Sequence, residues 1–315
     1  MKKVQLSPPL LALLLAIALF LLGGVLAPGF VNVEQAINIV RLSAFLGIIA
    51  AGQTLVILSG GEGIDLSIGA IVTLSAILVF RIVDGQNGMV LPALAVALLT
   101  GFLFGAINGL GITALGIPPL VMTLGMAGVV QGSILVLTQG QLVGKAAPIM
   151  STLISRPLVL GIPGVIFIWL ALGAVMWLLL ERTAYGKHLF AVGVNRTASR
   201  LSGVRVPRTV LITYALSGLL SAFGGFMLLG FTQNVFLSLG ERWLFPSVAA
   251  VVVGGTILAG GKGSYWGTMA GALVLTLISS LLTAVQLPEA ARQIILGVTL
   301  LVLLSVYGRQ RALRE

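Results

Sequence analysis

The segment ILSGGEGIDLSIGA, residues 57–70, joins two long apolar runs and places the acidic residues Glu62 and Asp65 among glycines. A similar segment, ILAGGKGSYWGTMAGA, occupies residues 257–272 and has Lys262 in the position of Glu62. Glycine adopts positive φ without steric cost, so paired glycines commonly form turns. Each segment can be a phosphate-binding loop, a metal site or a turn between two membrane helices.

The composition indicates a membrane protein. Of the 315 residues, 58% are hydrophobic and only 8% are charged, and the mean hydropathy is +1.14. Soluble domains carry about 25% charged residues. Apolar runs long enough to cross a hydrocarbon core of about 30 Å recur along the chain. We therefore expect an all-α, polytopic membrane protein with a single transmembrane domain over residues 1–315.

We expect about ten transmembrane helices, and both termini in the cytoplasm. With these spans, twelve Lys and Arg residues fall on the side of the termini and six on the other side. Positive residues accumulate in cytoplasmic loops and meet anionic lipid there, which accounts for the net charge of +10 without nucleic acid. The expected spans are residues 9–27, 37–58, 67–83, 90–112, 120–138, 164–180, 210–231, 245–260, 267–286 and 290–308.

Of the three kinds of site for the glycine-rich segments, the turn between helices is favoured. A phosphate-binding loop needs Ser or Thr after Gly-Lys, but Lys262 is followed by Gly263. Glu62 and Asp65 are too few ligands for a metal, and the chain has no cysteine and one histidine. We predict no metal and no cofactor, with Asp65 as the N-cap of the next helix. The predicted turn glycines are Gly60, Gly61, Gly260 and Gly261.

Small residues predict close contacts between helices. Gly101, Gly105 and Gly109 form two consecutive GxxxG steps, and Gly267 with Gly271 forms another. Glycines at this spacing let two helix backbones approach closely in a bilayer. The pattern predicts a compact bundle and carries little information about function.

Polar side chains inside the apolar runs are candidate pathway residues. Such groups are costly in lipid and usually face a partner helix or a pathway. They are neutral, which suits an uncharged polyhydroxylated solute better than an ion; the alternative is that they form structural bonds between helices. No span centre carries Asp, Glu or Lys, which disfavours an ion-coupled carrier, and no catalytic constellation is present. The candidates are Gln53, Asn108, Thr123 and Gln131, with Thr54 and Ser133 beside them.

Residues 181–209, ERTAYGKHLFAVGVNRTASRLSGVRVPRT, form a basic segment predicted on the cytoplasmic face. Asn195 is a suitable N-cap, residues 196–202 can form two short turns, and Gly203 is a suitable stop. Charge favours contact with lipid headgroups, whereas exposed apolar residues favour a protein partner, and both alternatives stay open at this point. The apolar residues expected to be exposed are Leu189, Phe190, Val192, Val194 and Leu201.

Four segments together resemble one protein family. They are QTLVILSGGEGIDLSIGAIVTLSA, NGLGITALGIPPLVMTLGMAGVVQGSILVLT, RTAYGKHLFAVGVNRTASRLSGV and VAAVVVGGTILAGGKGSYWGTMAGAL. In this order they resemble the integral-membrane permeases of bacterial ABC importers, closest to the ribose/xylose/arabinose branch, with branched-chain amino-acid permeases more distant. The resemblance covers essentially the whole chain. It departs from the family in the first turn, where the family usually reads SGGIDLSVG and this chain has two more residues.

The resemblance implies a non-catalytic, inner-membrane permease that translocates a monosaccharide or a similar small polyol. Its implied partners are two cytoplasmic ATP-binding subunits, a soluble solute-binding protein and a second permease subunit in a homo- or heterodimer. Residues 181–209 would form the coupling loop that the ATP-binding subunits contact, and the four candidate polar residues would line the pathway. The residues expected to take part in coupling are Tyr185, Gly186, Gly193, Asn195, Ala198, Arg200 and Gly203.

Other functions remain open from the sequence. The solute can be a nucleoside or a branched-chain amino acid, and competition by those solutes would reveal this. A stand-alone secondary carrier would transport without any ATP-binding subunit.

Overall fold

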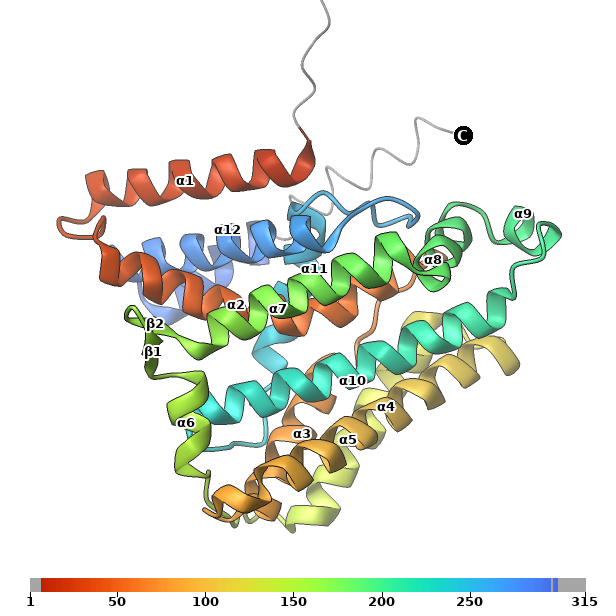
Figure 1. Ribbon diagram of the computed structural model, residues 1–315, viewed down its shortest axis with the longest axis horizontal. Helices are drawn as coiled ribbons and strands as arrows, with labels where there is room; N and C mark the ends of the chain where they lie inside the picture. The colour runs from red at the N-terminus through yellow and green to blue at the C-terminus, as the bar shows by residue number, and fades with distance from the viewer. Residues whose placement is uncertain (1–6, 296, 300–315) are drawn as a thin grey trace, which may run out of the picture.

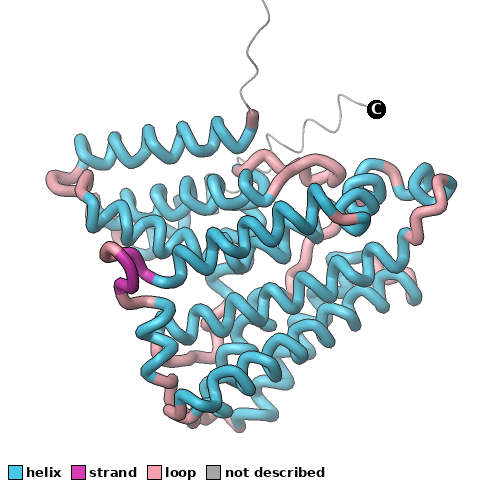
Figure 2. Tube along the Cα trace, in the orientation of Figure 1, coloured by secondary structure: helices cyan, strands magenta, loops and turns pink. Residues whose placement is uncertain are grey.

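The computed structural model describes residues 7–295 and 297–299, and most of this part of the chain is helical (Figures 1 and 2). The expectation of an all-α membrane protein is confirmed at this level. The strand structure of the described residues is one antiparallel hairpin of β1 (Pro157–Val159) and β2 (Ile162–Pro163). The helices are α1 (Pro8–Leu26), α2 (Val33–Leu58), α3 (Ile68–Val83), η1 (Asn87–Met89), α4 (Val90–Ala114), α5 (Pro119–Thr138), α6 (Pro148–Ile154), α7 (Gly164–Trp177), η2 (Leu178–Arg182), α8 (Ala184–Val194), α9 (Arg196–Leu201), α10 (Val206–Thr232), α11 (Glu241–Val253) and α12 (Tyr265–Ala284).

Within the described residues, seven helices are long and apolar enough to cross a membrane. They are α1, α2, α4 with η1, α5, α7 with η2, α10 and α12, whereas α3 is apolar but has only 16 residues. The chain is therefore a polytopic membrane protein. Nine of the ten predicted spans overlap these helices, and the tenth, 290–308, begins in helical residues (290–295 and 297–299) and then extends beyond the described residues. The predicted span 245–260 ends early, at Val253, because Gly255 has a φ of 90° and starts a turn.

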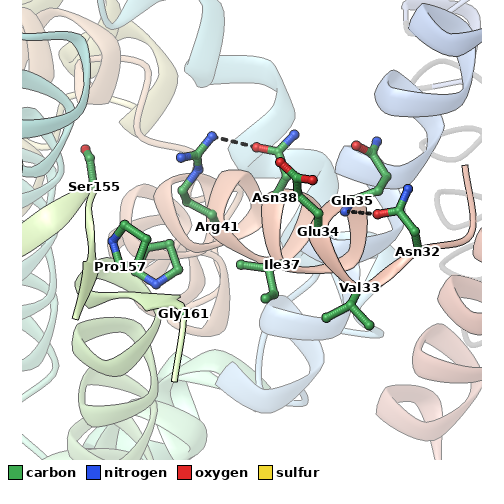
Figure 3. Close-up of a pocket in the computed structure, with 11 residues that line it drawn as sticks. Asn32, Val33, Glu34, Gln35, Ile37, Asn38, Arg41, Ser155, Pro157 and Gly161 are labelled. Atoms are coloured by element: carbon green, nitrogen blue, oxygen red, sulfur yellow. Dashed lines mark hydrogen bonds between the residues drawn. The ribbon is translucent and has the colours of Figure 1, made fainter. Parts of the chain in front are cut away.

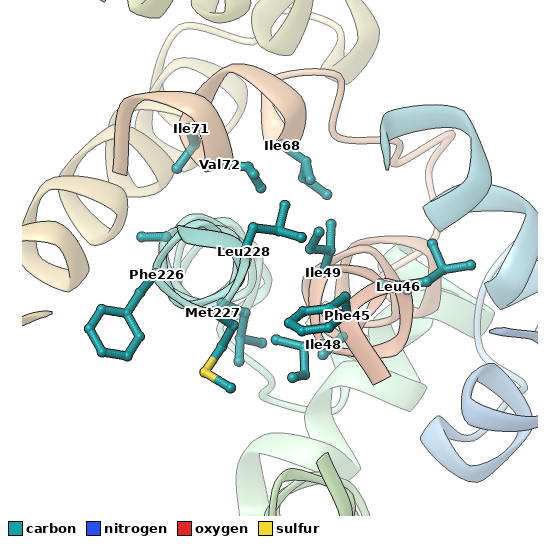
Figure 4. Packing of buried hydrophobic residues seen from close by; sticks show 14 of the residues in the cluster. Phe45, Leu46, Ile48, Ile49, Ile68, Ile71, Val72, Phe226, Met227 and Leu228 are labelled. Carbon is teal, nitrogen blue, oxygen red and sulfur yellow. The ribbon is translucent and has the colours of Figure 1, made fainter. Parts of the chain in front are cut away.

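Helices α2 and α10 form the centre of the bundle. In their most apolar windows 83% and 72% of the residues are buried, against 22% in α4 and α5 and 17% in α1. Figure 4 shows the packed side chains, with Phe45 and Ile49 of α2 facing Met227 and Leu228 of α10. Because lipid is as apolar as these side chains, close packing and not exclusion from water favours this arrangement. Helices α1, α4 and α5 keep faces that are open to lipid or to a partner.

Glycines bring helix backbones into contact, as the GxxxG spacing predicts. A Cβ added at Gly105 of α4 would overlap the carbonyl oxygen of Tyr214 in α10. A Cβ added at Gly271 of α12 would overlap the carbonyl oxygen of Ala250 in α11. The predicted close helix contacts are confirmed at both places.

Helices α3 and α11 begin inside the bundle. Asp65, three residues before α3, bonds to Ser217, which lies near the middle of the 27-residue α10. Gly240, directly before α11, donates its N–H to the hydroxyl of Thr73 in α3 at 2.9 Å. The N-terminal ends of α3 and α11 therefore lie side by side, about half-way through the bundle.

Candidate functional site

The segment 57–70 forms a turn followed by an irregular run into the bundle. Gly60 and Gly61 have φ values of 67° and 64°, in the region that favours glycine, and Glu62 also has a positive φ of 60°. Residues 63–65 have no regular structure, and α3 begins at Ile68. The chain thus turns at the end of α2 and returns to mid-bundle before the next helix starts.

Asp65 is fully buried and accepts hydrogen bonds from three donors. Its Oδ1 accepts from the backbone N–H (3.0 Å) and the hydroxyl (2.6 Å) of Ser67, and its Oδ2 accepts from the hydroxyl of Ser217 (2.8 Å). The N-cap of α3 is Ser67, so our prediction of Asp65 as N-cap was wrong. The carboxylate closes a local turn on Ser67, as short acidic side chains do, and also reaches α10. Asp65 thereby fixes the irregular run to the centre of the bundle.

Three of the four predicted pathway residues are fully buried within the chain. Asn108 donates to the Ser67 hydroxyl at 2.9 Å, and Thr123 donates to the carbonyl oxygen of Ile64 at 3.2 Å. Gln53 of α2 has no hydrogen-bond partner on either amide atom within the described residues. Asn108 of α4 and Thr123 of α5 therefore hold the irregular run before α3, in addition to the bond from Ser217 of α10.

The fourth residue, Gln131 of α5, is exposed and lies apart from the other three. Its Nε2 donates to Oε1 of Glu241 at 3.3 Å. Glu241 is exposed and is the first residue of α11, whose N-terminal end lies beside that of α3. The carboxylate therefore lies near mid-bundle depth, where contact with lipid is unfavourable and a polar pathway or a partner is expected.

The face of α5 around Gln131 is open. Neither Gly128 nor Gly132 has any atom within 4 Å of an added Cβ. Large apolar side chains on this face, including Leu124 and Leu135, are also exposed. The face thus combines an accessible backbone with one polar pair, formed by Gln131 and Glu241.

The two glycine-rich turns, about 200 residues apart in sequence, meet at one end of the bundle. Gly261 donates its N–H to the carbonyl oxygen of Leu58 at 3.0 Å. A Cβ added at Gly260 would overlap the backbone of Gly60, and one added at Gly193 of α8 would lie 2.5 Å from the Gly261 nitrogen. The turns of α2–α3 and α11–α12 and the end of α8 therefore form one tightly packed glycine junction.

Helices α8 and α9 lie at this end of the bundle, away from the β1–β2 hairpin (Figure 1). Asn195 caps α9 by accepting a bond from the Ala198 N–H at 2.9 Å, and Gly203, with a φ of 83°, follows the helix end. Tyr185 bonds through its hydroxyl to Thr213 of α10 at 2.9 Å, and burial raises the pKa of this phenol above its ordinary value. Gly186 lies against the carbonyl oxygen of Leu180, whereas Ala198, Arg200 and Gly203 are exposed.

The exposed apolar surface of residues 181–209 is smaller than we predicted. Leu189 and Val192 are buried, because α8 packs this face against the bundle, and Phe190 is partly buried. Val194 and Leu201 remain 69% and 86% exposed. The surface available to a partner is therefore α9 itself with Val194 beside it.

Comparison with known proteins identifies the family. The model of the family described as "Branched-chain amino acid transport system / permease component" matches residues 35–304. The chain belongs to this family. A ribose import permease of Bacillus subtilis is 35% identical over 90% of this chain and 88% of its own length, and one of Escherichia coli K12 is 32% identical over 96% and 93%. An autoinducer 2 import system permease of Escherichia coli is 33% identical over 100% of this chain and 91% of its own length. No solved structure matches the chain.

At the end of the permease opposite to α9, a recess of about 760 Å³ opens between the first turns of α2 and the β1–β2 hairpin (Figure 3). Its wall carries Asn38 and Arg41, joined by a hydrogen bond of 2.6 Å, together with Glu34 and Gln35. Polar side chains thus gather at both ends of this permease.

Sequence reasoning missed two residues of the permease that the structure places at the site. Glu241 precedes the span that we expected to start at residue 245, and its pairing with Gln131 joins residues 110 positions apart. Ser217 is one of several hydroxyl residues in an apolar run, and only the fold shows that it faces Asp65. The one signal for Glu241 in the sequence is that an acidic residue stands at the start of an apolar helix.

Proposed function

We propose that the chain is the permease subunit of an ATP-driven importer for a monosaccharide or a similar small polyol. It has about ten transmembrane helices and both termini in the cytoplasm. The observation that carries the proposal is helix α9, a capped, exposed helix at one end of a chain that resembles import permeases along its whole length. Import of ribose and of autoinducer 2 by the relatives supports a small polyhydroxylated solute.

ATP hydrolysis takes place on separate cytoplasmic subunits that dock on α9. The glycines of both turns pack against each other, and neither turn has the Gly-Lys-Ser/Thr sequence of a phosphate-binding loop. Within the described residues, no group of three His, Cys, Asp or Glu side chains is placed to hold a metal. The docking surface comprises Arg200, Leu201 and Val194, which are exposed beside the Asn195 cap.

The solute crosses along the open face of α5, between two permease subunits. Gln131 and Glu241 provide amide and carboxylate groups that can bind sugar hydroxyls. A second subunit over this face removes the carboxylate from lipid, where it is costly. Gln53, Asn108 and Thr123 are buried and support this pathway from behind, by holding the helices that flank it. A soluble binding protein delivers the solute to the opposite end, where the polar recess opens.

Affinity purification from native membranes in mild detergent tests the proposal. The wild-type chain is compared with Arg200→Glu combined with Asn195→Pro, and with Lys145→Glu, which reverses an exposed charge in the connection between α5 and α6. We expect an ATP-binding subunit with the wild type and with Lys145→Glu but not with the double variant. A wild-type chain recovered alone, under conditions that preserve other ABC complexes, would refute the proposal and favour a secondary carrier.

Uptake into proteoliposomes then identifies the solute class. With the co-purified subunits and the binding protein present, labelled ribose is expected to enter only with ATP, and unlabelled pentoses are expected to compete. Competition by nucleosides or branched-chain amino acids, with none by pentoses, would overturn the solute assignment while leaving the transport mechanism intact.

A further inference from the structure

Arg196, the first residue of α9, reaches into the glycine junction. Its Nη2 donates to the carbonyl oxygen of Gly60 at 3.2 Å. Its guanidinium group also covers Gly61, where an added Cβ would overlap the guanidinium carbon. Arg196 is half-buried, whereas Arg200, one turn later on the same helix, is exposed. Arg196 therefore contacts the glycine junction, whereas Arg200 is available to the proposed ATP-binding subunit.

The contact of Arg196 reaches a part of the fold with little freedom to deform. Gly60, Gly193 and Gly260 touch through backbone atoms, and none of them has room for a side chain. A displacement of α9 therefore cannot be absorbed by rearranging side chains at the glycine junction. It must move the α2–α3 turn or break the contact.

The α2–α3 turn leads directly to the site. Five residues after Gly60, Asp65 is bonded to Ser217 of α10, and α3 begins three residues later. The N-terminal end of α3 contacts that of α11 through Gly240, and Glu241 follows. A continuous set of hydrogen bonds and backbone contacts thus joins α9 to the Gln131–Glu241 pair.

Arg196 also has an unused donor in this conformation. Its buried Nε has no hydrogen-bond partner within the described residues, and the same is true of the buried hydroxyl of Tyr214. Arg196 therefore keeps one N–H donor that can form a further hydrogen bond if α9 shifts.

We propose that Arg196 is a positioning residue that transmits the movement of α9 to the α2–α3 turn and so opens or closes the pathway at α3 and α11. The inference rests on the proposed function, because it assumes that an ATP-binding subunit moves α9. Arg196 contacts the α2–α3 turn, and this turn has two more residues than the related family pattern.

The test uses the complete importer in proteoliposomes, with Arg196→Ala, Arg196→Lys and the control Lys145→Ala, which removes an exposed charge between α5 and α6. ATP hydrolysis, solute uptake and the amount of assembled complex are measured together. Arg196→Ala is expected to assemble and to hydrolyse ATP close to the wild-type rate, while solute moved per ATP falls by about tenfold, the factor that loss of one hydrogen bond to a charged group gives. Arg196→Lys keeps a donor for Gly60 and is expected to recover part of this ratio, and Lys145→Ala to retain all of it.

Spin labels provide a second readout that does not depend on turnover. Because the chain has no cysteine, Thr197→Cys and Lys262→Cys, both at exposed positions, can be labelled specifically. The distance between the labels is expected to be narrowly distributed with and without ATP, and to broaden in Arg196→Ala.

The measurements distinguish a failure of the role of Arg196 from a failure of the proposed function. An Arg196→Ala importer with an unchanged solute-to-ATP ratio and an unbroadened distance would overturn the role of Arg196 and leave the proposed function standing. A wild-type complex without ATP-dependent uptake would overturn the proposed function, and this inference with it.

Discussion

Replacing Gly105 by alanine tests the packing of α4 on α10 directly. An added Cβ would overlap the carbonyl oxygen of Tyr214 and lie 3.0 Å from the Ala215 Cα. Both neighbours are backbone atoms, so no side-chain rotation relieves the contact. The two helices must separate, and the adjacent contact of Gly101 with α10 is loosened as well.

The expected loss of stability follows from two opposing terms. Overpacking costs about 1–3 kcal/mol, and in this case the rigid neighbours favour the upper part of the range. Alanine in place of glycine favours the helix by about 1 kcal/mol. The net change for Gly105→Ala is therefore a loss of about 1–2 kcal/mol.

Gly128→Ala in α5 is the matched control, because nothing lies within 4 Å of its added Cβ. It retains only the gain in helix propensity, so it is expected to stabilise the protein by roughly 0.5–1 kcal/mol. Thermal unfolding in detergent, followed by the fluorescence of the four tryptophans, compares the two variants. We expect a melting temperature below wild type for Gly105→Ala and equal or higher for Gly128→Ala. Equal melting temperatures of the two variants would refute the backbone contact between α4 and α10.

Substitutions at three further positions test the site. Asp65→Ala leaves the three donors on Ser67 and Ser217 without their acceptor and is expected to lower stability by about 3 kcal/mol, whereas Asp65→Asn keeps an acceptor and is milder; equal melting temperatures would contradict the assigned bonds. Asn195→Ala removes the cap of α9, at a cost of about 1 kcal/mol, and should weaken recovery of the ATP-binding subunit on affinity beads, while Asn195→Asp preserves it; the cap is unimportant for docking if both bind alike. Glu241→Ala is expected to slow initial solute uptake without changing complex assembly, with Glu241→Gln intermediate, and an unchanged rate would remove Glu241 from the pathway.

The predictions that succeeded depend on local physics. Hydropathy located seven helices that are long and apolar enough to cross a membrane, because the bilayer sets the length of an apolar run. The start of α9 at Asn195 and its end before Gly203 could be read from sequence because caps act within a few residues. The GxxxG contacts likewise follow from residue size and spacing.

The predictions that failed depend on which face of a helix is covered. Leu189 and Val192 look exposed in a basic loop, and only the docking of α8 on the bundle buries them. The same limit applies to the amides of Asn108 and Gln131, one of which is buried and the other exposed. Apolar helices in lipid carry no amphipathic pattern that distinguishes a protein-facing side from a lipid-facing side, so burial follows from tertiary packing alone.

The opening segment shows why an acid can be needed where nothing is catalysed. A chain that turns back before α3 exposes backbone N–H and C=O groups at membrane depth, and lipid can satisfy none of them. The structure supplies partners from within: Asp65 accepts from the Ser67 N–H, and Thr123 donates to the Ile64 carbonyl oxygen. These bonds allow α3 to start in mid-bundle beside α11, and that arrangement brings Glu241 to the same depth. The buried carboxylate at residue 65 is therefore a structural condition for the exposed carboxylate at residue 241, and loss of the first is expected to disturb uptake through the second.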